Sequence, residues 1–163
     1  SLIAEDDTHK KKVKKNQFST PIGPLLQQVA GVDLCRIPGI SEVTALEYMA
    51  EVGCDMSKWE TPKRFAAWNN VVPNNKITGE KVIRSALMKK KNKAGQCLRM
   101  AASTLWHDKS PLGDFYRIHR AKSGGKGAVV ATAHKMSRII FIMLKDKVEY
   151  NPEMLAQAQI SHT

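Results

Sequence analysis

The amino-acid sequence predicts an all-α protein, a single helical domain with a helix-hairpin-helix-like element and a basic loop or short hairpin. Apolar residues recur at helical spacings in several stretches, capping residues precede those stretches, and strand patterns are few. With 163 residues, of which 42% are hydrophobic, the chain can bury one core. We expect a basic arm or remnant of a preceding helix over 1–24, the domain over 25–150, and a flexible tail over 151–163.

The first elements are two short helices around a tight turn. One helix is expected over Leu25–Ala30, and Pro-Gly between two isoleucines predicts a turn over Ile37–Ile40. Ser41 can cap the second helix, and Gly53 ends it. The predicted buried residues of this helix lie at spacings of three and four and are Val43, Leu46 and Ala50.

The turn makes this region similar to a helix-hairpin-helix. In such a hairpin, a glycine lets backbone amides point at a phosphate, so Gly39 is a candidate nucleic-acid contact. The alternative is a packed helical hairpin without DNA contact. That alternative is favoured by three acidic residues on the second helix, Glu42, Glu47 and Glu51.

A third helix is expected to begin at Thr61-Pro62, as N-cap and first residue, and to end at Asn69-Asn70. Its predicted buried side consists of Phe65, Ala66 and Trp68. We expect Trp59 and Trp68 to be core aromatic residues rather than stacking platforms.

Three more helical segments follow a basic stretch over 73–91, which is expected to be a loop or short hairpin. The first has a predicted buried stripe of Ala94, Leu98, Ala101 and Leu105, with Arg99 on another face. The second begins at Ser110-Pro111, and three glycines around Lys126 interrupt the chain after it. The last is expected from about Ala128 to Lys147, with a buried face of Val129, Ala133, Met136, Ile140 and Met143.

Positive charge is concentrated in one part of the chain. The formal net charge is +11, and residues 74–126 carry thirteen of the 26 basic residues but three of the 15 acidic ones. This concentration favours a polyanionic partner, most commonly nucleic acid, over a merely solvated charged face. The predicted nucleic-acid face consists of Lys76, Lys81, Arg84, Lys89, Lys90, Lys91, Lys93 and Arg99.

The chain has no readable catalytic or metal-binding motif of its own. No His-Glu-x-x-His, P-loop or serine-hydrolase motif occurs, and the five histidines are scattered. Cys35, Cys54 and Cys97 form no Cys-x-x-Cys pair, and three lone thiols fit a reducing cytoplasm. No apolar run approaches the roughly 18 residues that span a membrane. We therefore expect no metal or other cofactor in this chain, and no membrane contact.

A series of short stretches identifies a family by its order and spacing. The stretches include Ile37–Ile40, Glu51-Val52-Gly53, Phe65–Trp68, Pro73–Val82, Asn92-Lys93-Ala94, Leu98–Ser103, Leu112–Arg117 and Ala131–Arg138. From about Val32 to Tyr150, the sequence resembles the C-terminal domain of DEDD-type insertion-sequence transposases, the group that includes the Piv-like DNA invertases.

The resemblance implies a mechanism shared between two domains. Such transposases join an N-terminal RuvC-like domain, with four acidic metal ligands, to a C-terminal domain that supplies a serine. The serine attacks the DNA backbone and leaves a covalent intermediate. Members use a structured non-coding RNA to choose DNA targets and assemble as multimers. The implied partners are therefore DNA, a structured guide RNA as a further option, and full-length copies in a homo-oligomer.

This sequence departs from the family pattern at the serine. Thr78, before Gly79, stands at the family's serine position, and its β-methyl group crowds an in-line approach. Asn69-Asn70-Val71 also replaces a more usual Leu-Gly-Leu. The RuvC-like domain, to which any divalent metal would belong, is not in this sequence.

We therefore expect a decayed copy or fragment of a transposase, cytoplasmic and nucleoid-associated in a bacterium. It would retain DNA affinity and be inactive on its own. The alternatives are a non-enzymatic basic nucleic-acid-binding module and a decayed reading frame without a selected role.

Overall fold

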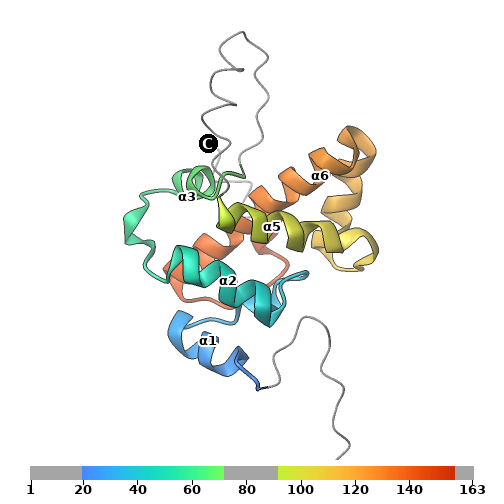
Figure 1. Ribbon diagram of the computed structural model, residues 1–163. Helices are drawn as coiled ribbons and strands as arrows, with labels where there is room; N and C mark the ends of the chain where they lie inside the picture. The colour runs from blue at the N-terminus through green and yellow to red at the C-terminus, as the bar shows by residue number, and fades with distance from the viewer. Residues whose placement is uncertain (1–19, 72–91, 157–163) are drawn as a thin grey trace, which may run out of the picture.

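The computed structural model describes residues 20–71 and 92–156, which form helices and turns without a strand in those ranges (Figure 1). The predicted all-α class is confirmed. In chain order the elements are α1 (Gly23–Ala30), the 3₁₀ turn η1 (Leu34–Arg36), α2 (Glu42–Val52), the 3₁₀ turn η2 (Met56–Lys58), α3 (Pro62–Trp68), α5 (Lys93–Ser103), the 3₁₀ turn η3 (Thr104–His107) and α6 (Pro111–Asp146).

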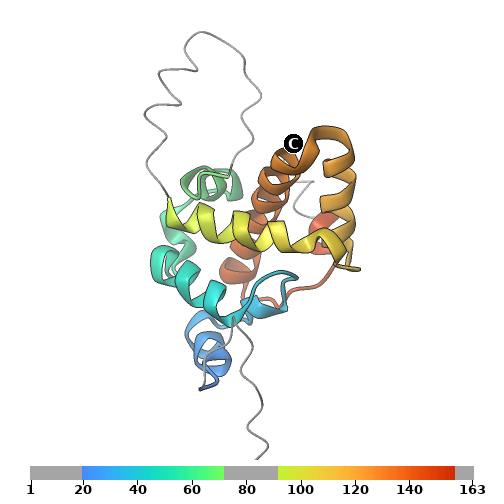
Figure 2. The ribbon, with the colours of Figure 1, turned by 45° about the vertical axis from the view of Figure 1, so that its right-hand side comes forward.

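Helix α6 bends sharply at Gly124, where φ is 75° and ψ is 179°, and this confirms the predicted break among the glycines. The bend divides α6 into a first arm, 111–123, and a second arm, 125–146, which turns back beside it (Figure 2). The second arm forms the centre of the core, because α3 and α5 both pack on α6 and α2 packs on α5. Its buried apolar residues are Ala128, Ala133, Met136, Ile139, Ile140, Phe141, Met143 and Leu144.

Most of the apolar stretch of α6 is buried inside the fold. Within the described residues, α6 alone is long and apolar enough to cross a membrane, with a mean hydropathy of 1.3 over its most apolar 18 residues. Of that window, 67% is buried against the rest of the protein, as in the core helix of a soluble protein.

Local capping explains where the helices begin and end. The side-chain oxygens of Ser41, Thr61 and Ser110 each accept a hydrogen bond from the backbone N–H three residues later, at 3.2 to 3.3 Å. Such a cap contributes about 1 kcal/mol. At the other ends, Gly53 and Asn70 adopt positive φ values of 73° and 55°. All five predicted boundaries are thereby confirmed.

The Ile37–Ile40 turn is packed into the fold. The N–H of Ile40 donates to the carbonyl of Ile37 at 3.1 Å, and Gly39 has a φ of 88°, as the third residue of a type II turn requires. A Cβ at Gly39 would lie 2.7 Å from the carbonyl oxygen of Ala101, so the turn needs glycine for close packing as well. The element directly before the turn is η1 rather than α1, so the expected pair of helices is interrupted.

The predicted buried face of α2 is wrong. Leu46 is 38% exposed and Ala50 is exposed, and the buried residues are Ala45, Tyr48, Met49 and Val52. Both sets have helical spacing, so the sequence pattern alone could not choose between them. The face that packs on α5 is the one that carries the larger Tyr48 and Met49 side chains.

The prediction that Trp68 belongs to the core is also wrong, because its side chain is 41% exposed. Phe65 occupies the core position of α3, with 0% exposure. Trp59 is half-buried and packs between the two, with ring centroids 4.9 Å from Phe65 and 5.4 Å from Trp68. Trp68 therefore covers an inner aromatic pair from the solvent side.

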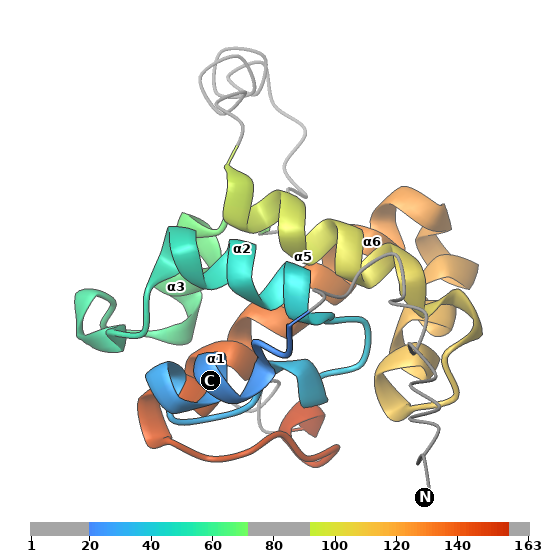
Figure 3. The ribbon, with the colours of Figure 1, turned by 60° about the horizontal axis from the view of Figure 1, so that its bottom comes forward.

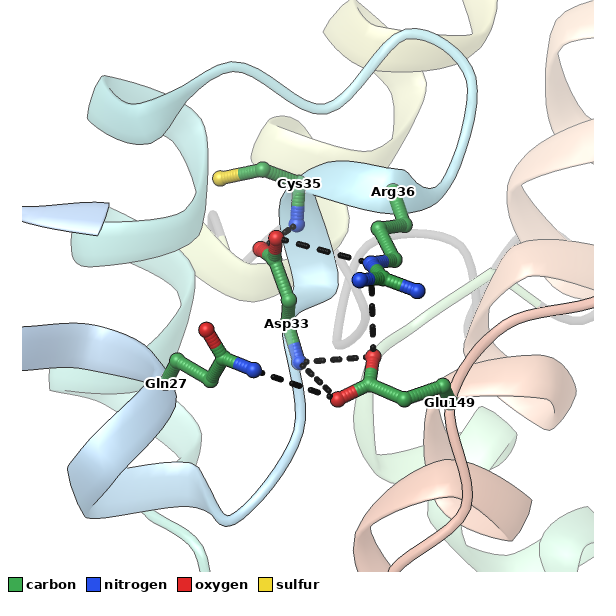
Figure 4. Close-up of polar contacts among 5 residues, drawn as sticks. All are labelled: Gln27, Asp33, Cys35, Arg36 and Glu149. Atoms are coloured by element: carbon green, nitrogen blue, oxygen red, sulfur yellow. Dashed lines mark hydrogen bonds and ion pairs between the residues drawn. The ribbon is translucent and has the colours of Figure 1, made fainter. Parts of the chain in front are cut away.

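The chain after α6 is fastened to the α1–η1 connection (Figure 4). The backbone N–H of Asp33 donates to both carboxylate oxygens of Glu149, at 3.1 and 3.3 Å, and Gln27 and Arg36 also reach Glu149. In Figure 3, this segment accordingly runs beside α1. Met154, within the segment predicted as a tail, is only 2% exposed.

Candidate nucleic-acid interface

Most of the predicted site lies in one segment of the chain. Seven of its residues are outside the described residues, namely Thr78, Lys76, Lys81, Arg84, Lys89, Lys90 and Lys91. The structure describes Lys93, Arg99 and Gly39, together with the residues on either side of segment 72–91. How the two ends of that segment are held is therefore visible.

Asn69 holds the end of α3, on one side of the segment. It is fully buried, its Oδ1 accepts a hydrogen bond from the Tyr48 hydroxyl at 2.8 Å, and its Nδ2 donates to the Phe65 carbonyl at 2.6 Å. Burial raises the pKa of Tyr48 well above its ordinary value, against the opposing effect of the Asn69 hydrogen bond, so the phenol stays a neutral donor. Asn69 thus ties α3 to α2.

Asn92 and Arg99 hold the start of α5, on the other side. The Asn92 Oδ1 caps α5 by accepting the Gly95 N–H at 3.1 Å, and its Nδ2 donates to the Trp68 carbonyl. The Arg99 Nη1 donates to the Asn70 carbonyl at 3.1 Å. The two ends of segment 72–91 are thereby fixed against each other. We call this set the asparagine anchor: Asn69, Asn70, Asn92 and Arg99.

The anchor gives a physical reason for the departure of this sequence from Leu-Gly-Leu at 69–71. Asn70 takes up the left-handed conformation that glycine would otherwise supply, at a φ of 55°. Asn69 adds two buried side-chain hydrogen bonds that leucine could not make. The two asparagines therefore have structural roles at the end of α3: Asn70 supplies the left-handed residue and Asn69 supplies the hydrogen bonds.

Arg99 has a second environment on its other side. A groove of about 410 Å³ lies between α5 and the two arms of α6, and it adjoins the anchor through Arg99. We call it the α5–α6 groove, and its lining residues are Arg99, Tyr116, Gly125, Lys126, Val129 and Val130. Tyr116 and the valines give it apolar walls, and Arg99 and Lys126 bring positive charge to it. One hydrogen bond to Asn70 uses one of the five N–H donors of Arg99, so this side chain can also bind a ligand.

Additional cations surround the bend of α6. Arg120, Lys122 and Lys126 are exposed, at the end of the first arm and the start of the second. Arg117 differs from them, because it forms an ion pair with Asp114 at 2.6 Å and donates to the carbonyl of Trp106 at 3.0 Å. Arg117 therefore positions η3, and the other three cations are accessible to a ligand.

Two cations of the second arm are buried. Lys135 and Arg138 are only 6% and 1% exposed. Burial lowers the pKa of both, and Arg138 lowers that of Lys135 further. The Lys135 ammonium donates to the Leu155 carbonyl at 3.3 Å. Neither side chain is placed to meet a phosphate at the surface.

The positive excess of the described residues belongs to α5 and α6. Residues 20–71 carry four basic and six acidic side chains, and residues 92–156 carry eleven basic and five acidic ones. Arg120, Lys122 and Lys126 were not among the site residues predicted from the sequence, although they lie around the glycines of the bend. The signal in the sequence was a basic cluster interrupted by glycines. It indicates a binding surface only when the bend is known, because the bend brings residues 126–130 opposite Arg99 and Tyr116.

No group of three histidine, cysteine, aspartate or glutamate side chains that could hold a metal ion occurs in the described residues. That this chain binds no cofactor stays a prediction. The contact of Gly39 with nucleic acid also stays a prediction; a Cβ at Gly39 would point at Ala101 of α5 and at Thr104 and Leu105 of η3.

Comparison with known proteins defines the class as a transposase domain. The sequence model described as Transposase IS116/IS110/IS902 family matches residues 33–117, more than half of the chain. The chain belongs to this family. No curated protein and no solved structure gives a significant match to it.

The matched residues run from Asp33, just before η1, to Arg117 in the first arm of α6. They include the Ile37–Ile40 turn and the whole asparagine anchor. The second wall of the α5–α6 groove, from Gly125 to Val130, lies beyond the match. Membership of a transposase family implies interaction with DNA.

Proposed function

We propose that this chain is the DNA-binding and strand-transfer portion of an insertion-sequence transposase that acts in DNA transposition and recombination. One observation carries the proposal beyond family membership. The asparagine anchor holds both ends of the segment that contains Thr78 and six predicted cations, and Arg99 of the anchor also lines a cationic groove. A groove that carries positive charge and adjoins the residues flanking this segment is suited to bind a sugar-phosphate backbone.

The finer proposal is that Thr78 occupies the position of the nucleophile in DEDD-type, Piv-like transposases. A hydroxyl is a weak nucleophile until a base or a metal ion activates it. In the proposed mechanism that activation comes from a separate RuvC-like domain, and this chain binds and orients the DNA. A guide RNA, assembly as a homo-oligomer and a cytoplasmic, nucleoid-associated location belong to the same proposal.

Replacing Thr78 with serine is expected to increase DNA cleavage by about tenfold or more when the RuvC-like half is supplied in trans. Serine keeps the hydroxyl and removes the β-methyl group, and small errors in the placement of a nucleophile are costly in rate. The measurement is the nicking of a supercoiled plasmid. Thr78→Ala is the control and should give no cleavage. If Thr78→Ser cleaves no faster than the unchanged chain, the assignment of Thr78 is wrong.

The alternative function is a non-enzymatic nucleic-acid-binding module, and the threonine at position 78 favours it. The module would bind DNA through the same groove without strand transfer. The trans assay separates the two functions: binding without cleavage by any Thr78 variant supports the module, and cleavage by Thr78→Ser supports the transposase.

Binding of duplex DNA is expected to weaken steeply with salt, with a log–log slope of about −0.9 for each phosphate contact. Lys126→Gln should make this slope shallower by about one unit, because it removes one contact. Fluorescence anisotropy at several salt concentrations measures both. Lys58→Gln is the matched control, since Lys58 is also an exposed lysine, on η2 at the other side of the fold from the α6 bend (Figure 1). Salt-independent binding, or none at low salt, would overturn the proposed DNA contact.

A further inference from the structure

An exposed tryptophan covered by an arginine lies beside the α5–α6 groove. Trp106, on η3, is 41% exposed, and the guanidinium carbon of Arg120 lies 3.9 Å from the centre of its ring. At this distance the guanidinium plane and the indole attract each other. Arg120 is itself exposed, so this pair presents a cationic side chain, supported by an aromatic ring, to the solvent.

The indole is held in place from two sides. Arg117 donates to the Trp106 carbonyl at 3.0 Å, and Arg117 is in turn fixed by its ion pair with Asp114. The Trp106 ring meets the ring of Tyr116 edge-on, with centroids 6.3 Å apart. Trp106 therefore has a defined position that does not depend on Arg120 alone.

The pair is continuous with the groove. Tyr116 touches Trp106 and lines the groove as well. Gly125 lines the groove too, and a Cβ there would lie 3.9 Å from Arg120 Nη1. The surface therefore combines a planar cation, a mostly apolar hollow and the charge of Lys126.

This combination exceeds what a contact with phosphates alone requires. Phosphates need positive charge and carry no requirement for a planar or apolar surface. Unpaired bases do stack on aromatic rings and on arginine planes, and an apolar hollow suits the face of a base. In a regular duplex those faces are already stacked on neighbouring bases, so they cannot use the surface.

We propose that the Arg120–Trp106 pair and the adjoining groove bind an unpaired nucleobase of a single-stranded nucleic acid. The base stacks on the Arg120 plane, and the exposed ammonium groups of Lys122 and Lys126 bind the flanking phosphates. The inference rests on the proposed function in needing a nucleic-acid partner, and it adds which form of nucleic acid this surface recognises.

The test compares Arg120→Lys with the unchanged chain on two probes: a fluorescein-labelled oligothymidine strand and a labelled duplex hairpin. Lysine keeps the charge and removes the plane. Affinity for the single strand should fall about tenfold, and affinity for the duplex should stay within about twofold, because stacking one base is worth roughly that much. Arg64→Lys, which changes another exposed arginine on α3, is the matched control and should leave both affinities unchanged.

The outcomes separate this inference from the proposed function. A chain that binds neither probe at low salt would contradict the proposed function itself. Binding of both probes with equal loss, or with no loss, in Arg120→Lys would leave nucleic-acid binding intact and overturn the base-stacking site. An oligouridine strand forms a parallel arm, and a selective loss on either strand supports the site. If affinity falls more for the oligothymidine strand, the ligand of this site is single-stranded DNA. If it falls more for the oligouridine strand, the ligand is RNA. A thermal unfolding curve like that of the unchanged chain is required for Arg120→Lys.

Discussion

Gly95→Ala is expected to lower the free energy of unfolding by about 3 kcal/mol, the upper range for overpacking a buried site. A Cβ at Gly95 would overlap the backbone carbonyl oxygen of Asn69 and lie 3.0 Å from Arg99 Nη1. The carbonyl belongs to a fully buried residue and cannot swing away as a side-chain end could. Relief therefore requires α5 to move away from Asn69 at the end of α3, which stretches the Asn92–Trp68 and Arg99–Asn70 hydrogen bonds as well.

Urea unfolding followed by circular dichroism measures this effect. The matched control is Gln96→Ala, one residue further along α5, where the side chain is exposed and the change should stay within about 0.5 kcal/mol. If Gly95→Ala unfolded at the same urea concentration as the unchanged chain, α5 and the Asn69 backbone would not be in the close contact described. The anchor at the ends of segment 72–91 would then have no basis.

Gly124→Ala is expected to destabilise the protein by about 1 to 3 kcal/mol, because φ 75° and ψ 179° form a backbone conformation that is essentially restricted to glycine. Nothing lies within 4 Å of a Cβ at Gly124, so the whole cost is in the backbone torsions. The adjacent Gly125 is helical and its Cβ would meet nothing closer than 3.9 Å. Gly125→Ala should therefore be neutral or up to about 1 kcal/mol more stable.

Thermal unfolding of the two alanine variants side by side is the measurement. They have the same composition and differ by one position in the chain, so the comparison reports the backbone conformation at the two positions. Equal stability of the two variants would show that α6 does not bend at Gly124. In that case Lys126 and Val129 would no longer lie opposite Tyr116, and the groove would lose one of its walls.

Much of the fold could be predicted from the sequence because helix ends are local features. A side-chain oxygen at Ser41, Thr61 or Ser110 satisfies the backbone three residues later without help from any distant segment. The break near Gly124 could be predicted for the same reason, since three glycines within four residues oppose a continuous helix.

The phase of a helix could not be predicted in the same way. Two sets of apolar residues in α2 have the same helical spacing. One set is Val43, Leu46 and Ala50, and the other is Ala45, Tyr48 and Val52. The choice depends on α5, which packs on α2, and on Asn69, which accepts the Tyr48 hydrogen bond from 21 residues away.

The candidate site was only partly predictable. The basic character of 74–126 was visible in the sequence, and so was the position of Arg99 on a different face of its helix from the buried stripe. The groove was not, because it joins Arg99, Tyr116 and the 125–130 segment through the bend of α6. The exposed position of Trp106 was equally invisible, since an aromatic residue at the end of a helix is more often part of the core.

Lysine acetylation followed by mass spectrometry, with and without saturating nucleic acid, tests the central claim most directly. The claim is that the surface formed by the α5–α6 groove and the bend of α6 is the nucleic-acid face. Lys122 and Lys126 should be protected by bound nucleic acid, and Lys58 and Lys145, which are also exposed, should react as they do in the free protein. Equal reaction of Lys126 in the free and bound protein, with protection at Lys58 or Lys145 instead, would place the interface elsewhere.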